Sequence, residues 1–324
     1  MKTLRKILCA ALAATCVIGM TFATSCGKSA DFKVGICQLV RHDALDAATE
    51  GFKFALEAEL KKEGKTVEFD EQNAQGDTVM CGQIVTSFVT GKVDLIMANA
   101  TPALQSAVAG TQTIPILGTS VTNYEDALFH KLTNGATGYN VSGTSDLADL
   151  EGQANMLLDL LPNVKKVGIL YCSAEANSQY QADELKKHFA AKNVVAEDVK
   201  FSDSNDLQSV CNSAVGKYDA IFVPTDNTAA ANGEIIDGVF RSKKIPVFAG
   251  EEGICKKCGF ATLAISYRRL GEQTGVMAAK ILLGNAKVGE MPIEIDTKQE
   301  KKYSKARCEE LGITIPENAG YIEI

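Results

Sequence analysis

Apolar and polar positions along the chain follow two alternating patterns, and the whole succession occurs twice. Short apolar runs predict buried strands, and stretches with apolar residues three or four positions apart predict helices. Strands are predicted at 32–36, 66–69, 94–98 and 113–117, and again at 165–171, 194–199, 219–223 and 244–248. Helices are predicted between them, around 45–60, 77–91, 182–190 and 205–216.

The repeat is clearest where residues 91–104 (GKVDLIMANATPAL) correspond to residues 216–229 (GKYDAIFVPTDNTA). Strands that alternate with helices predict parallel sheets with right-handed crossovers. We therefore predict an α/β protein with two similar, doubly wound parallel-sheet lobes. The first lobe should comprise residues 32–142 plus about 267–290, and the second residues 143–266 plus about 291–324. A Gly- and Ser-rich segment, 138–145, is the predicted first crossover, and a helix around 270–282 should return to the first lobe.

Ligands of open α/β sheets bind outside the carboxyl ends of the strands, and two facing sheets would enclose a cleft there. The residues that follow the predicted strands are mostly small and polar. The candidate ligand-binding residues are Gln38, His42, Asn73, Thr101, Thr119, Thr122, Asn177, Ser178, Thr225, Asp226, Asn227, Glu251 and Tyr267.

These side chains suggest a ligand with two opposite charges. Thr101-Pro102 and Asn177-Ser178 lie at predicted helix starts, where backbone N–H groups favour a carboxylate. Asp226 follows a buried strand and suits an ammonium group, although it could instead cap the helix that begins at Asn227. Glu251 could likewise belong to a solvated loop, and His42 could either contact the ligand or simply begin a helix. The combination favours an amino acid.

Composition and motifs exclude several other functions. The 324 residues carry a net charge of −7 with no basic run that would indicate nucleic-acid binding. No two of the three histidines have the spacing of metal ligands, and no common nucleotide-binding or hydrolase motif occurs. We therefore expect no cofactor and no metal.

The N-terminus has the pattern of an export signal. Positive residues precede an apolar stretch from Ile7 to Ala23, and small residues then lead to Cys26. We interpret residues 1–25 as a lipoprotein signal peptide, Cys26 as the acylated residue and residues 26–31 as a tether. Ala23 departs from the usual lipobox, so ordinary signal-peptidase cleavage is the alternative, and an uncleaved membrane helix is disfavoured by its length.

Seven cysteines remain beyond Cys26. Cys255 and Cys258 form a single CxxC, for which a disulfide loop, a metal half-site and a redox pair are alternatives to a structural role, which we favour. Cys37 and Cys172 occupy related positions in the two lobes. Buried free thiols are the simplest interpretation, and an exported racemase-type enzyme is a remote one.

Several motifs resemble a known family. These motifs resemble the substrate-binding proteins of bacterial tryptophan/tyrosine ABC transport systems: Gln38-Leu39-Val40 with His42 and Ala44–Ala48, Gln72–Asp77, Ala100–Ala103, Ser145–Leu147, Glu175–Ser178 and Pro224–Thr228. The resemblance covers essentially the whole mature chain. It implies a periplasmic-binding-protein type I fold with a three-crossover hinge, and a monomeric, lipid-anchored extracytoplasmic receptor that delivers its ligand to a membrane permease. For some members it implies an aromatic amino acid as the ligand.

The chain also departs from the family pattern near the expected cleft. Arg41 and Asp43 flank His42, Asn123-Tyr124 replaces an Asp-Pro pair, and 171–174 reads Tyr-Cys-Ser-Ala. With no Trp in the chain, Tyr124, Tyr171 and Tyr267 are candidates for stacking on a ligand. A ligand-sensing receptor of the same fold is the alternative to a transport role.

Overall fold

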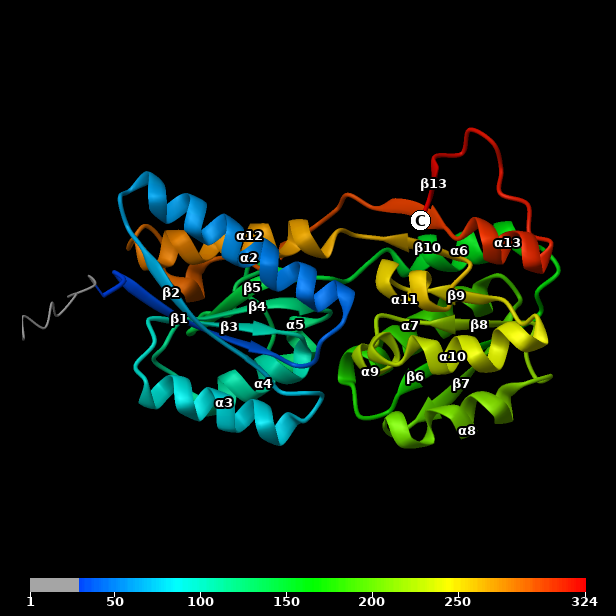
Figure 1. The fold of residues 1–324 in the computed structure, drawn as a ribbon, viewed down its shortest axis with the longest axis horizontal. Helices are drawn as coiled ribbons and strands as arrows, with labels where there is room; N and C mark the ends of the chain where they lie inside the picture. The colour runs from blue at the N-terminus through cyan, green and yellow to red at the C-terminus, as the bar shows by residue number, and fades with distance from the viewer. Residues whose placement is uncertain (1–28) are drawn as a thin grey trace, which may run out of the picture. The chain divides into compact units, whose positions relative to one another are not determined.

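Two parallel sheets form the framework of the computed structural model, which describes residues 29–324 (Figure 1). The predicted signal peptide and the acylation site at Cys26 lie outside the described residues. Residues Asp31–Ile324 make up one unit by their internal packing. No helix in this described part is long and apolar enough to cross a membrane.

The first lobe contains a six-stranded sheet in the order β11-β5-β4-β3-β1-β2. Helices α3 and α4 pack together beside it, and α2 packs against α12. The elements are β1 (Phe32–Gln38), α2 (Asp43–Lys62), β2 (Val67–Asn73), α3 (Thr78–Thr90), β3 (Leu95–Asn99), α4 (Thr101–Gly110), β4 (Ile116–Val121), α5 (Tyr124–Leu128), β5 (Val141–Ser145), α12 (Tyr267–Leu282), η2 (Val288–Glu290) and β11 (Glu294–Ile295).

The second lobe contains a seven-stranded sheet in the order β13-β12-β10-β9-β8-β6-β7. Its β12 runs antiparallel to β10, whereas the other pairs are parallel. The elements are α6 (Leu150–Leu160), β6 (Lys166–Cys172), α7 (Ala176–Ala191), β7 (Val195–Phe201), α8 (Ser204–Ala214), β8 (Ala220–Val223), α9 (Asn227–Ala231), α10 (Gly233–Phe240), η1 (Arg241–Lys243), β9 (Val247–Ala249), α11 (Glu252–Lys257), β10 (Ala261–Ala264), β12 (Glu300–Tyr303), α13 (Lys305–Leu311) and β13 (Tyr321–Glu323).

The predicted duplication is confirmed by the strand order. Strands β2-β1-β3-β4-β5 of the first lobe correspond to β7-β6-β8-β9-β10 of the second. The repeated sequences form β3 and β8, and both strands are buried along their whole length. Their continuous apolar runs are typical of parallel strands covered on both faces. The fourth strand begins at Ile116, three residues later than predicted, because Pro115 precedes it.

Two predicted lobe boundaries were wrong. Residues 141–145 are not a crossover but strand β5, which pairs with β4 in the first sheet. Small polar residues are typical of loops, which is why this segment was predicted as one. In the structure these residues are buried, and their hydroxyls have hydrogen-bond partners inside the lobe. The Ser142 hydroxyl donates to the Met291 carbonyl, and that of Thr144 lies 2.8 Å from that of Thr274. Strand β11 also belongs to the first lobe, so the tail crosses over only after Ile295.

Three crossovers therefore join the lobes, at 146–149, 265–266 and 296–299. Helix α12 returns to the first lobe as predicted and packs closely on α2. A Cβ at Gly271 would overlap the backbone of Ala48, so only glycine permits this approach. The crossover segments thus run between two independently cored lobes.

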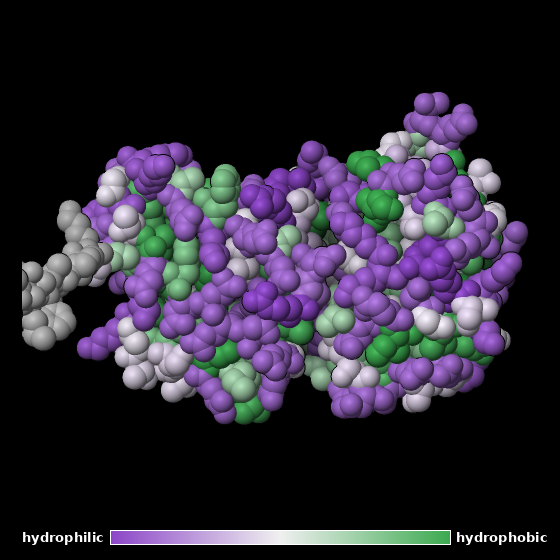
Figure 2. All heavy atoms as spheres, viewed as in Figure 1, coloured by the Kyte–Doolittle hydropathy of each residue, from purple (hydrophilic) through white to green (hydrophobic). Residues whose placement is uncertain are grey.

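Apolar side chains fill the interiors of both lobes, and the face visible in Figure 2 is largely hydrophilic with scattered apolar patches. The seven cysteines of the described residues are all buried free thiols. Cys255 lies within α11 and Cys258 ends it, each thiol donating to a nearby backbone carbonyl. Residues 29–324 contain no cluster of His, Cys, Asp and Glu side chains that could hold a metal ion.

Candidate ligand-binding site

The carboxyl ends of the strands in both lobes meet at a small cavity between the lobes. It measures about 10 Å³, enough for a single water-sized molecule. Seven of the predicted residues line it, together with Ser120, Asp146 and Ala230. The predicted residues in this cavity are His42, Asn177, Thr225, Asp226, Asn227, Glu251 and Tyr267.

One hydrogen bond crosses the cleft. His42 lies immediately before α2, and its Nε2 is 3.3 Å from Oδ1 of Asn227, the first residue of α9. Burial lowers the pKa of His42, which favours the neutral imidazole. The Nδ1 atom of the ring is buried without a hydrogen-bond partner. His42 therefore both begins a helix and faces the cavity, so its two predicted roles coexist.

Asp226 combines a capping role with a position in the cavity. It follows β8, and its carboxylate accepts hydrogen bonds of 2.7 Å from the backbone N–H groups of Ala229 and Cys172. Asp226 is almost fully buried. Burial and the nearby Glu175 raise its pKa, because both disfavour the charged form, whereas the hydrogen bonds act in the opposite direction. The buried Ser178 hydroxyl contributes one of these opposing bonds.

A second buried acid, Glu175, holds the same helix start. One of its carboxylate oxygens accepts from the backbone N–H and side-chain amide of Asn227, at 3.0 and 2.7 Å. The other accepts from the N–H and hydroxyl of Thr228, both at 2.8 Å. We did not predict Glu175 as a site residue, although it begins a motif shared with the family. A buried acid just before a predicted helix was the available signal.

Glu251 is also a buried helix cap. It precedes α11 and accepts hydrogen bonds from the N–H groups of Gly253 and Ile254. Burial raises its pKa to about 7. The adjacent Glu252 points elsewhere and pairs with Lys256 and Lys302. Glu251 therefore does not lie in a solvated loop.

Three hydrogen-bonded side chains, those of Asp146, Tyr267 and Thr122, lie on the hinge side of the cavity. Asp146, in the first crossover, accepts from the Tyr267 hydroxyl at 2.7 Å and from the Thr122 hydroxyl at 2.9 Å. Burial raises the pKa of Asp146. Thr122 and Tyr267 were predicted to bind the ligand, and the structure places both on Asp146. Asp146 itself follows a strand that we had read as a loop, and we noted it only as part of a motif shared with the family, not as a site residue.

The side chains on the first-lobe side of the site are uncharged, and fewer of their polar atoms have hydrogen-bond partners. The hydroxyls of Thr101 and Ser120 are buried without hydrogen-bond partners. Non-glycine residues with positive φ occur at both strand ends, with Ala100 at 93° and Ser120 at 55°. Such strained backbone tends to occur at functional sites. Thr101 begins the ten-residue α4, whose first-turn N–H groups lack partners within the helix. Asn177 Oδ1, from the second lobe, is another unpartnered polar atom.

Six of the predicted residues do not line the cavity: Thr101, Thr122 and Ser178, described above, and Gln38, Asn73 and Thr119. Gln38 bonds to Val40, Asp46 and Thr49 within the first lobe. Asn73 accepts from the backbone of Gln75 at the end of β2, and the Thr119 hydroxyl is 3.2 Å from that of Thr144. Thr119 does not face the cavity, whereas its neighbour Ser120 does, because successive residues of a strand point to opposite faces of the sheet.

Two of the proposed stacking residues also lie elsewhere. The Tyr124 hydroxyl donates to the Thr144 carbonyl inside the first lobe, and the Tyr171 hydroxyl donates to Gln179. The rings of both residues are buried in the lobe cores. Among the three candidates, only Tyr267 lines the cavity.

The thiols offer no support for an enzyme. Burial raises the pKa of Cys172 to about 11, and its thiol donates to the Ser202 carbonyl. The pKa of Cys37 is raised chiefly by its hydrogen bond to Cys81, with burial acting in the same direction. Both thiols are therefore held in the protonated, unreactive form.

A larger groove of about 570 Å³ opens at the mouth of the cleft, on the side away from the hinge. It shares Asn227 with the cavity and has Glu175 in its wall. Leu39, Val40 and Pro102 give the groove an apolar side in the first lobe. No aromatic side chain of the described residues lines it.

Comparison with known proteins agrees with this architecture. The profile of the family described as ABC transporter substrate binding protein matches residues 33–320. A tyrosine-binding protein from Clostridioides difficile (strain R20291) is 36% identical over 292 residues, covering 86% of this chain and 84% of that protein. The chain thus belongs to the family of ABC transporter substrate-binding proteins, and its fold is periplasmic binding protein type I.

Two solved structures differ in how well they superpose. A Streptococcus pneumoniae ABC domain in complex with L-Trp is 31% identical, with a TM-score of 0.84, and the match covers 90% of this chain and 100% of that one. The ligand-free, open structure of a Clostridium difficile substrate binding protein with adhesive properties is 36% identical. Its TM-score is only 0.69, with 90% and 99% of the chains covered. Within residues 31–324, the lobes are thus arranged more like those of the L-Trp complex, in keeping with the bond between His42 and Asn227.

Proposed function

We propose that this protein binds an amino acid, with aromatic ones favoured, between its lobes and delivers it to an ABC importer. The observation that carries this proposal is the contrast within one cavity between buried carboxylates and unpartnered neutral polar atoms. Buried polar groups normally have partners, so the free atoms of His42, Ser120 and Asn177 support a ligand site at this cavity. The relatives that bind tyrosine and L-Trp support the same ligand class.

The ligand ammonium group would lie against the second lobe. Asp226 and Glu251 line the cavity and Glu175 stands directly behind Asn227, while none of the described lining residues is Lys or Arg. An ammonium group would neutralise part of this negative charge in a region where water is excluded. The raised pKa values of Asp226 and Glu251 reflect chiefly the cost of ionising buried carboxyls, which a neighbouring cation would offset.

The ligand carboxylate would lie against the first lobe. There the Ser120 hydroxyl and the start of α4 can donate hydrogen bonds, with His42 Nδ1 nearby as a further polar group. The side chain needs more room than the cavity provides, so we propose that it extends into the groove along Leu39, Val40 and Pro102. An aliphatic wall can bury an aromatic ring without stacking.

Closure follows from these contacts, because the ligand touches both lobes only when they are together. Binding would then shift the population toward the closed state. We propose that the protein is exported, anchored by lipid on Cys26, and acts as a non-enzymatic monomer that presents the ligand to a membrane permease. Its family membership and the signal-like N-terminus support this role.

Thermal unfolding of residues 27–324 in the presence of each of the twenty amino acids and of small sugars tests the proposal. A ligand at 100 times its dissociation constant should stabilise the protein by about 2.7 kcal/mol. We expect tyrosine, tryptophan or phenylalanine to raise the midpoint most. If only sugars raise it, the amino-acid assignment is wrong.

A further inference from the structure

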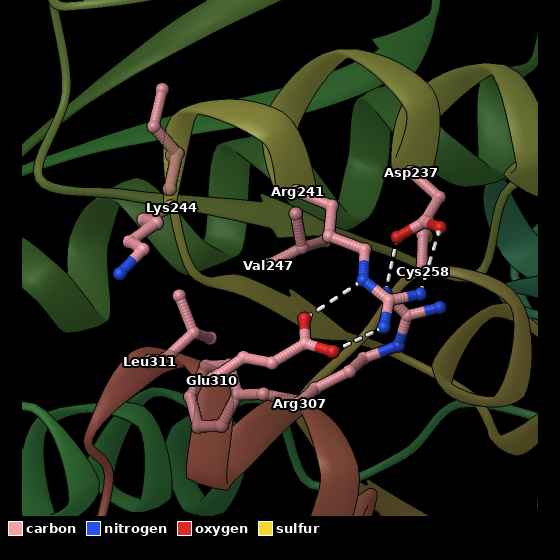
Figure 3. A pocket seen from close by; sticks show the side chains of 10 residues that line it. Asp237, Arg241, Lys244, Val247, Cys258, Arg307, Glu310 and Leu311 are labelled. Carbon is pink, nitrogen blue, oxygen red and sulfur yellow. Dashed lines mark hydrogen bonds and ion pairs between the residues drawn. The ribbon is translucent and has the colours of Figure 1, made fainter.

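A second cavity, of about 310 Å³, lies in the second lobe away from the cleft (Figure 3). It is located at the amino ends of β9 and β10, whereas their carboxyl ends face the cleft. Val247, Phe260 and Leu311 give it an apolar lining. It shares no residue with the cavity or the groove between the lobes, so it is not part of the site proposed above.

Two ion pairs lie at the rim of this second cavity. In each pair the arginine and the carboxylate come from different segments, and each segment supplies one arginine and one carboxylate. Arg241, in η1, pairs with Glu310 of α13, with Nε and Oε2 2.8 Å apart. Arg307, in α13, pairs with Asp237 of α10 and also donates to a backbone carbonyl. Both pairs tie α13 to the α10–η1 segment, as the dashed lines in Figure 3 show. They hold the cavity in a fixed shape, which lowers the entropic cost of binding.

Lys244 leaves one positive charge unmatched at this rim. Three cationic side chains line the cavity against two carboxylates, and both carboxylates are engaged by the arginines. Within residues 29–324, Lys244 forms no ion pair. Its side chain is drawn apart from the two ion pairs in Figure 3, beyond Leu311. A positive charge without an ion-pair partner beside an apolar surface suits an anion with an apolar body.

We propose that this second cavity binds a small amphipathic monocarboxylate, with its apolar part on Val247, Phe260 and Leu311 and its carboxylate toward Lys244. The volume falls at the lower end of the range of small-molecule pockets, and the lining has their usual character, apolar with a few polar groups. The inference is independent of the amino-acid ligand of the cleft.

A calorimetric titration of the purified protein with 3-phenylpropanoate tests the proposal. The neutral alcohol 3-phenylpropanol and the cation 3-phenylpropylamine serve as matched probes of the same shape. We expect the carboxylate to bind most tightly, and K244M to weaken it about fivefold while leaving the alcohol unaffected. If all three probes bind equally, or if K244M binds the carboxylate with unchanged affinity, the proposal that Lys244 recognises the ligand carboxylate is wrong.

Leu311 provides a second readout, because its side chain lines this cavity and lies outside the cleft. L311A should weaken binding of both the carboxylate and the alcohol about tenfold, since it removes apolar surface from the proposed site. L-tyrosine and L-tryptophan should not displace the probe, since they are expected in the cleft. Displacement by either amino acid, or unchanged binding of both probes in L311A, would show that the carboxylate binds elsewhere and refute the second site.

Discussion

The two walls of the cleft are built on equivalent strand ends but differ in how their polar groups are held. In the second lobe, Glu175, Asp226 and Glu251 each accept at least two hydrogen bonds from their own lobe. In the first lobe, the Thr101 and Ser120 hydroxyls have no partner. The second-lobe wall therefore holds acidic groups in fixed positions, and the first-lobe wall has donors left for a ligand. The same β-α unit thus supplies opposite halves of one site.

The largest expected effect comes from removing a charge from the second-lobe wall with D226N. We expect ligand affinity to fall by at least about 30-fold, because a buried, hydrogen-bonded charge pair contributes several kcal/mol. The measurement is calorimetry with tyrosine and tryptophan, and the thermal midpoint without ligand reports whether the fold survives. D149N is the matched control, since Asp149 caps α6 outside the cavity. Affinity retained within threefold in D226N would leave Asp226 with its capping role alone.

The charge on this wall should also make binding depend on pH. Burial raises the pKa of Glu251 to about 7 and that of Asp226 to about 8, so without ligand both carboxyls are mostly protonated in mildly acidic solution. An ammonium ligand favours the ionised form, and binding therefore releases protons. We expect affinity to fall at least about tenfold between pH 7.5 and pH 5.5, measured by calorimetry in buffers of different ionisation enthalpy.

The unliganded protein should respond to pH in the opposite sense. Acids with raised pKa values hold protons more tightly in the folded state, so their contribution to stability is lost as pH rises from the ordinary value through the raised one. Thermal midpoints without ligand should therefore decline between about pH 5 and pH 8 because of Asp146, Asp226 and Glu251. An affinity independent of pH would argue against an ammonium group at these acids.

On the first-lobe wall, S120A should have an intermediate effect. Loss of one hydrogen bond to a charged carboxylate corresponds to about tenfold weaker binding. Stability without ligand should stay within about 0.5 kcal/mol, because the hydroxyl has no partner to lose. T262V removes another unpartnered buried hydroxyl, one that lies outside the cavity, and should leave binding unchanged. If S120A binds normally, the ligand carboxylate is not at this wall.

The sequence was sufficient to predict the duplicated fold because continuous apolar strands and amphipathic helices determine it locally. It was also sufficient for seven residues of the cavity, since the ends of parallel strands necessarily meet there. It failed where small polar residues are buried with distant partners. Strand β5 looked like a loop, and Asp146 after it was not assigned to the site, because the bonds of Thr144 and Asp146 reach Thr274 and Tyr267. Such contacts depend on tertiary packing.

The smallest expected effect is that of T119V, one residue before Ser120. The Thr119 hydroxyl belongs to a chain of threonine hydroxyls that continues through Thr144 to Thr274, inside the first lobe and not in the cavity. Valine keeps the shape and removes only that hydrogen bond. We therefore expect a loss of about 1 kcal/mol in unfolding free energy by denaturant titration and less than a twofold change in ligand affinity. Adjacent residues of one strand would then separate stability from binding, since S120A should do the reverse. A tenfold loss of affinity in T119V would mean that the strand turns this hydroxyl toward the ligand when the lobes close on it.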